Sequence, residues 1–199
     1  MDAYGIDITL FMPEPHGVDN APSCNFGHLG EIVENFPARF AMLLGGETLN
    51  VMIQRVVTEP DTYTYEAIKD EFQARALEIL ATGAVGFGEM AAEHFSLASN
   101  HPYVSAPPDH PLFKDLADIA ALYDVPIDLH MEALTSDLKF ADLPDCSTLY
   151  KQSQLNYGSH FNDPDVFPEN ITAFKTLLDY NPNAKIIWVH AGWDNTNER

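Results

Sequence analysis

Residues 110–132 read HPLFKDLADIAALYDVPIDLHME, and this stretch decides the fold because a helix pattern runs directly into a strand pattern. In its first half, apolar side chains recur at spacings of three and four residues: Leu112, Leu116, Ile119, Ala120 and Tyr123. That period predicts a helix over about 111–123 with these side chains turned inward, and Pro111 favours a helix start at this point. The mostly apolar run 125–130 then predicts a buried strand.

Strand and helix patterns alternate in both directions from this stretch. Strands are predicted over five ranges: 5–12, 39–44, 84–89, 125–130 and 184–190. Helices are predicted over five others: 27–35, 47–56, 64–81, 111–123 and 168–180. Strand ends recur at roughly 30 to 60 residues, the length of a strand, a helix and two connections in a (β/α) barrel. We therefore expect an α/β fold of the (β/α)8 TIM-barrel type, with its strands parallel and neighbouring in chain order.

The chain is short for a closed barrel of this type. It has 199 residues, whereas an eight-stranded (β/α) barrel typically takes about 250. A strand pattern starts within the first few residues and another ends close to Arg199, so both ends look like cuts through a larger fold. We expect one domain, residues 1–199, that holds about strands two to six of an incomplete barrel. Its open sheet edges favour association, so we also expect a homo-oligomer.

The charge of the chain excludes several classes of partner. It carries 30 acidic and 10 basic side chains, for a formal net charge of −20. Such a surface repels phosphates and anionic lipid headgroups, so we expect neither nucleic acid nor a membrane as partner. No apolar run approaches the roughly 20 residues of a membrane-spanning helix. Cys24 and Cys146 lack the spacing of a structural zinc site. We expect a cytoplasmic protein that acts on a small molecule.

Two histidines, His130 and His190, each end a predicted parallel strand after a mostly apolar run. Active sites of (β/α) barrels form at this carboxyl end of the strands. Imidazole is a common zinc ligand and the side chain best suited to proton transfer near neutral pH. Since neighbouring strands lie roughly 4.8 Å apart, we expect both imidazoles at equal height in one cavity. For either residue alone, a structural hydrogen-bonded histidine is the alternative.

Glu89 ends the third predicted strand in the motif GAVGFGEM, whose glycines allow a loop or ligand to approach the backbone closely. A carboxylate at this place could bridge a second metal, orient a ligand residue or accept a proton. A capping or salt-bridging glutamate is the alternative. We take His190 and Glu89 as candidate catalytic residues, and His130 and His190 as candidate metal ligands.

Three further residues near strand ends are expected to bind substrate: His16, Glu132 and Trp193. His16 follows a Pro-Glu-Pro turn at the end of the first predicted strand. His94 and His101 lie just beyond Glu89 and are better placed to line a pocket than the rest. The rest are expected in solvated or capping positions: His28, His110 and His160.

Three motifs carry a family resemblance. GAVGFGEM, then HPLFKDLADIAALYDVPIDLHME, then NPNAKIIWVHAGW (181–193), in that order and spacing, resemble the amidohydrolase-related metal hydrolases and decarboxylases of the amidohydrolase superfamily. MDAYGIDITLFMP (1–13) and NFPARFAML (35–43) fit the same pattern, so the resemblance covers nearly the whole chain.

The resemblance implies a metal-binding barrel with a defined set of ligands. Its first strand carries a His-x-His pair, its fifth and sixth strands each give a histidine, and its last gives an aspartate. By position, His130 matches the fifth-strand ligand and His190 the sixth-strand histidine. Glu89 falls where binuclear members place a bridging ligand. No His-x-His occurs in this chain, which departs from the pattern. The implied cofactor is a divalent metal ion, zinc first.

The leading hypothesis is a metal-dependent hydrolase that cleaves an amide, lactone or ester of a small molecule with metal-activated water, while His190 assists with protons. A decarboxylase on the same scaffold is one alternative. A non-catalytic barrel fragment is another, because ligands of the family pattern are missing. A nucleotide-binding doubly wound domain is the weakest, since neither GxGxxG nor GxxxxGK[ST] follows a strand.

Overall fold

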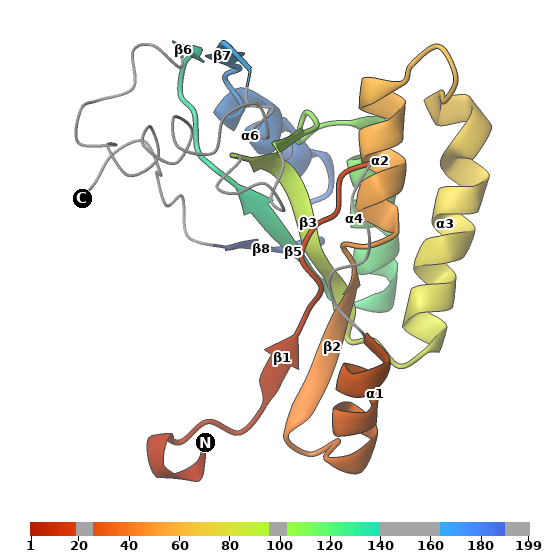
Figure 1. The fold of residues 1–199 in the computed structure, drawn as a ribbon, viewed down its shortest axis with the longest axis vertical. Coiled ribbons are helices and arrows are strands. Elements are labelled where there is room, and N and C mark those ends of the chain that lie inside the picture. Colours follow the sequence, from red (N-terminus) through yellow and green to blue (C-terminus); the bar gives the residue numbers. More distant parts are fainter. Residues whose placement is uncertain (19–25, 96–102, 140–163, 190–199) are drawn as a thin grey trace.

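The computed structural model describes residues 1–18, 26–95, 103–139 and 164–189 (Figure 1). Its strands are β1 Thr9–Phe11, β2 Phe40–Gly45, β3 Gly86–His94, β4 Val104–Ser105, β5 Pro126–Met131, β6 Leu138–Lys139, β7 Val166–Phe167 and β8 Lys185–Val189. Its helices are the 3-10 turn η1 Asp2–Tyr4, then α1 Phe26–Asn35, α2 Leu49–Thr58, α3 Tyr65–Ala81, α4 Pro111–Tyr123 and α6 Ile171–Tyr180.

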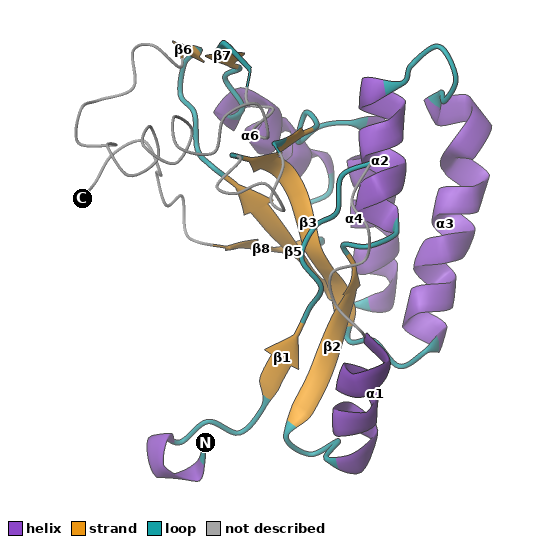
Figure 2. Ribbon diagram, viewed as in Figure 1, coloured by secondary structure: helices purple, strands orange, loops and turns teal. Residues whose placement is uncertain are grey.

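The main sheet is parallel along the order β1-β2-β3-β5-β8, with β4 antiparallel to the end of β3. The predicted parallel order of the five strands is therefore confirmed. The sheet curls into a half-barrel, and Figure 2 shows α2, α3 and α4 along one side of it. The architecture is α/β, as the sequence pattern predicts.

The face of the sheet that meets the helices holds the main core. Phe87 and Met90 of β3 and Leu129 of β5 are fully or almost fully buried, together with Phe72 of α3 and Leu116 of α4. Along β5, side chains alternate between the two faces because a strand has a period of two. The apolar members of β5 point to the helices: Ile127, Leu129 and Met131. The polar side chains therefore face the inside of the curl: Asp128 and His130 of β5, and Glu132, which directly follows the strand.

Helix α4 shows why local sequence predicts these elements well. The side chain of His110 accepts a hydrogen bond from the backbone N of Leu112 at 3.2 Å, and Asp124 closes the helix in the left-handed conformation with φ 57°. These caps fix the bounds that the apolar period predicts. Tyr123, expected to point inward, is 50% exposed. This expectation was wrong, because the buried face of α4 ends at Ala120.

Two predicted strand bounds also differ from the structure. β1 is confined to Thr9–Phe11, within the predicted range 5–12, because only these residues pair with β2. β3 continues past Glu89 to His94. Its far end is stabilised by pairing with both β4 and β5. Among the described residues, no helix is long and apolar enough to span a membrane.

Candidate metal centre

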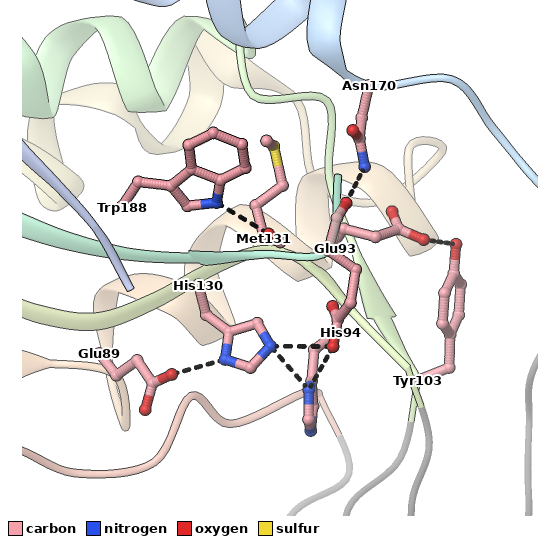
Figure 3. A network of polar contacts seen from close by, with 9 residues as sticks. Glu89, Glu93, His94, Tyr103, His130, Met131, Asn170 and Trp188 are labelled. Carbon is pink, nitrogen blue, oxygen red and sulfur yellow. Dashed lines mark hydrogen bonds and ion pairs between the residues drawn. The ribbon is translucent and has the colours of Figure 1, made fainter. Parts of the chain in front are cut away.

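The carboxyl ends of β3 and β5 bring three potential metal ligands together (Figure 3). β5 presents His130, and Glu132 follows directly after the strand. β3 ends in His94, and its register with β5 shifts between Ala91 and Glu93. In this arrangement the ring of His94 meets that of His130 edge to face, with centroids 4.6 Å apart.

The three donor atoms form a small triangle. His94 Nδ1 lies 3.2 Å from His130 Nε2, and His130 Nε2 lies 3.1 Å from Glu132 Oε1. The third side, from His94 Nδ1 to Glu132 Oε1, is 3.8 Å. His94 is 8% and Glu132 3% exposed. The donors are therefore held close together in a largely water-excluded place.

This triangle fits a tetrahedral metal ion. Nitrogen and oxygen ligands lie about 2.0–2.1 Å from zinc, so donors at tetrahedral angles lie about 3.3–3.4 Å from each other. The three sides of 3.1, 3.2 and 3.8 Å span that value. Two histidines and one glutamate are also a donor set that catalytic zinc sites use, with the fourth position left for water or substrate.

Glu89 supports His130 from the opposite side of its ring. His130 Nδ1 donates to Glu89 Oε1 at 2.6 Å. This bond places a proton on Nδ1 and directs Nε2 toward the other two donor atoms of the triangle. A carboxylate behind a ligating histidine fixes the tautomer and raises the basicity of the ring. The preceding Gly88 permits the close packing, because a Cβ at this residue would lie 2.8 Å from Cβ of Asp128.

The electrostatics of the metal-free site are dominated by buried carboxylates. Burial alone would lower the pKa of His130, but its hydrogen bonds to Glu132 and Glu89 outweigh burial and raise the pKa to about 9. Burial would raise the pKa of Glu132, and the hydrogen bonds from His130 and His94 bring it below its usual value. Without metal, His130 is thus an imidazolium between two carboxylates, and a metal ion would take the place of its Nε2 proton.

Asp128 lies beneath these residues on the same face of β5 and is 3% exposed. Burial, and then the charge of Glu89, raise the pKa of Asp128 to about 7, although His130 acts in the opposite direction. Its Oδ1 is buried and has no hydrogen-bond partner within the described part of the chain. Asp128 can therefore hold or release a proton near neutral pH.

Buried and partly buried hydrogen bonds brace the backbone around the site (Figure 3). Trp188 Nε1 donates to the carbonyl of Met131 at 2.9 Å, and Asn170 Nδ2 donates to that of Glu132 at 2.7 Å. Glu93 accepts from the hydroxyls of Tyr103 at 2.7 Å and of Ser105 at 2.6 Å. These bonds join the ends of β3, β4, β5 and β8, so they hold the triangle in place.

The structure brings together some of the residues that the sequence singled out. Glu89, His130 and Glu132 meet at one place, with Glu132 as a potential ligand in addition to the substrate contact expected of it. His190 and Trp193, together with His101 and His160, lie outside the described residues. The register pairs His130 with Val189. The expectation that His130 and His190 lie at equal height in one cavity stays a prediction, because position 190 is outside the described residues.

His16 lies elsewhere at the carboxyl end of the sheet, in the segment that follows β1. It is 2% exposed, and its Nε2 lies 3.7 Å from Glu14 Oε1. The sequence predicted neither His94 nor Glu132 as a ligand, and for His94 it indicated only a place that could line a pocket. The signal for His94 is the apolar pattern that continues past Glu89 through Met-Ala-Ala, which extends the strand until His94 ends it.

Comparison with known proteins provides no family assignment for this chain, so the resemblance of its motifs to the amidohydrolase superfamily stays an expectation. No family model matches the chain, and no match is found among curated proteins or solved structures.

Proposed function

We propose that this protein binds a divalent metal ion, zinc in the first place, through His94, His130 and Glu132, and acts as a metal-dependent hydrolase. The substrate class is a small molecule with an amide, lactone or ester bond. The observation that carries this proposal is the triangle of two imidazole nitrogens and one carboxylate oxygen, whose sides of 3.1–3.8 Å suit tetrahedral coordination.

The surrounding residues support a catalytic site in addition to a structural one. A bound divalent ion supplies Lewis-acid activation of water and of a carbonyl group. Glu89 keeps a proton on His130 Nδ1 and so orients the ring. Asp128, with a pKa of about 7, can accept or return a proton at its Oδ1. Three protein donors leave one position of a tetrahedral ion for a substrate or water.

The location of the triangle supports the same proposal. It lies at the carboxyl ends of parallel strands that are curled into a half-barrel. In (β/α) barrels the active site is built at this end of the strands. We therefore also propose that the half-barrel is of the (β/α)8 type, with a homo-oligomer covering its open edges.

Metal analysis and kinetics of matched variants test the proposal. The chain, stripped with a chelator and reloaded with zinc, is expected to bind one ion tightly. His94→Ala, His130→Ala and Glu132→Gln are each expected to lose it. Glu71→Gln, an equal charge change on the exposed side of α3, is expected to retain it. Cobalt loading should give the strong visible absorption of four-coordinate geometry.

Hydrolysis is measured on a panel of p-nitrophenyl esters, lactones and anilides. Turnover is expected with the reloaded chain, and it should disappear on metal removal and return with zinc. A chain that binds no metal would refute the whole proposal. Tight metal binding without turnover on any class of the panel would refute the hydrolase while leaving the metal site.

A further inference from the structure

The end of β3 carries two neighbouring residues whose side chains are both good metal donors, Glu93 and His94. Their side chains point in different directions, because side chains alternate along a strand. Figure 3 shows His94 turned toward His130 and Glu93 turned toward Tyr103. The strand therefore offers a carboxylate and an imidazole at this place, and the fold admits only the imidazole to the donor triangle.

The pairing of β3 with β5 contains an irregularity just before these two residues. Ala91 lies beside His130. The next pair joins Glu93 to Met131, so two steps along β3 match one step along β5. Ala92 is therefore the extra residue of a β-bulge. A bulge redirects the side chains that follow it, and bulges are frequent next to active sites.

The bulge places His94, instead of Glu93, at the metal centre. Residues side by side on parallel strands present their side chains to the same face of the sheet. Met131 packs in the main core, so its neighbour Glu93 is kept away from the inside of the curl. In a regular ladder, without the extra residue, Glu93 would lie beside Glu132 and face the ring of His130. A shift by one residue would thus exchange the two possible ligands.

Hydrogen bonds from β4 and the residue before it hold Glu93 in its present position. Tyr103 Oη donates to Glu93 Oε1 at 2.7 Å, and Ser105 Oγ donates to Glu93 Oε2 at 2.6 Å. The antiparallel register also pairs Glu93 with Ser105. Glu93 is 1% exposed, so these bonds form away from water. A shift of β3 by one residue would break both of them.

We propose that Glu93, Tyr103 and Ser105, here termed the register lock, are positioning residues that select the metal ion of the centre. The inference rests on the proposed function, since it takes the donor triangle as the metal site. With the lock in place, the triangle has two imidazole nitrogens and one carboxylate oxygen. After a shift by one residue, the set would be one imidazole nitrogen and two carboxylate oxygens.

These two donor sets prefer different ions. Imidazole suits zinc, whereas carboxylate oxygens suit manganese and magnesium. The register lock therefore favours zinc over manganese, because it keeps a second carboxylate out of the site. A hairpin that only supported the ligands would not discriminate, since its loss would weaken the binding of both ions alike. The ratio of the Kd for manganese to the Kd for zinc is therefore the property that the lock controls.

Metal affinities of a lock variant test the inference. The double variant Tyr103→Phe/Ser105→Ala removes both hydroxyl donors, and a buried carboxylate that loses hydrogen bonds is driven toward a cation. Its Kd for zinc chloride should rise about 10- to 100-fold, the usual effect of losing groups behind a ligand. Its Kd for manganese chloride should change by less than about threefold, because a carboxylate replaces the imidazole. Calorimetry measures zinc, and electron paramagnetic resonance counts bound manganese.

Three further variants separate selection of the metal from general damage. Tyr103→Phe alone removes one of the two bonds, so it should give an intermediate ratio, and it replaces the double variant if that chain does not fold. Glu93→Gln added to the double variant exchanges the incoming carboxylate for an amide, so manganese binding should weaken without recovery of zinc binding. Tyr180→Phe is the matched control. It removes a hydroxyl that donates to exposed Asp118 at 2.8 Å, and its ratio should equal that of the wild type.

The outcomes distinguish failure of the lock from failure of the proposed function. A wild-type chain that binds neither ion would refute the metal centre and the lock together. Zinc binding by the wild type with an unchanged ratio in the double variant, or in Tyr103→Phe, would refute the lock and leave the metal centre. An equal loss of both ions would also refute the lock, because it would show support of the ligands without selection between ions.

Discussion

Zinc binding at the metal centre is expected to strengthen as the pH rises from 7 to 9. Glu132 and Glu89 raise the pKa of His130 to about 9 against the effect of burial, so zinc must displace a proton from Nε2 at neutral pH. Two pH units below its pKa, a group is about 99% protonated, which weakens the apparent affinity about 100-fold relative to the deprotonated site. The Kd should therefore fall about tenfold from pH 7 to pH 8 and about fivefold from pH 8 to pH 9.

Calorimetry in buffers of different ionisation enthalpy measures this directly. About one proton should be released per zinc at pH 7, and the number should fall toward zero above pH 9. Glu89→Gln removes one of the two carboxylates that hold the His130 proton, so its proton release at pH 8 should be smaller. Its affinity at high pH should also be 10- to 100-fold weaker, because the ring loses its supporting carboxylate. A Kd that is constant from pH 7 to 9, with no proton release, would refute this account of the site.

Three other predictions concern stability and assembly. The folded pKa of Asp128 is about 7 against an ordinary value of 3.8, so its contribution to stability is fully present below about pH 3.8 and is lost as the pH rises through 7. Urea unfolding of the metal-free chain should therefore show a loss of about 2.5 kcal/mol between pH 5 and pH 8, and Asp128→Asn should abolish it. Gly86→Ala should destabilise the chain by about 2 kcal/mol or more, since its Cβ would lie 2.5 Å from the carbonyl oxygen of Pro126. Gly30→Ala in α1 should stabilise the chain by about 0.5–1 kcal/mol, because an added Cβ would meet no atom within 4 Å. Equal effects of Gly86→Ala and Gly30→Ala on the free energy of unfolding would contradict the packing argument. Sedimentation should show a dimer or larger assembly because β1 and β8 end the main sheet, and a clean monomer at micromolar concentration would count against edge association.

The secondary structure could be predicted from sequence where its signals are local. Helix α4 occupies the predicted range because its cap, its first-turn proline and its apolar period all lie within the segment itself. The strands in the predicted ranges pair in chain order, since short helical crossovers join neighbouring parallel strands. The predicted strand stopped at Glu89, although the apolar pattern continues through Met-Ala-Ala, and pairing with β4 and β5 keeps the last residues of β3 extended.

The candidate site was predictable only in part for a similar reason. Glu89 and His130 stand at the ends of apolar runs, and that position alone makes them candidates. The partnership of His94 with His130 joins residues 36 apart in sequence and depends on a register shift between β3 and β5. No local pattern encodes that shift.

The sequence by itself determined that this chain alternates strands and helices and that titratable side chains follow its buried strands. Both conclusions depend on periodicity, which neighbouring residues are sufficient to reveal. Only the tertiary structure decided that His94 and Glu132 complete the triangle with His130, that Glu89 lies behind that ring, and that burial shifts the pKa of Asp128. Distances between donor atoms and exclusion of water are properties of packed strands, and they exist only once distant segments lie side by side.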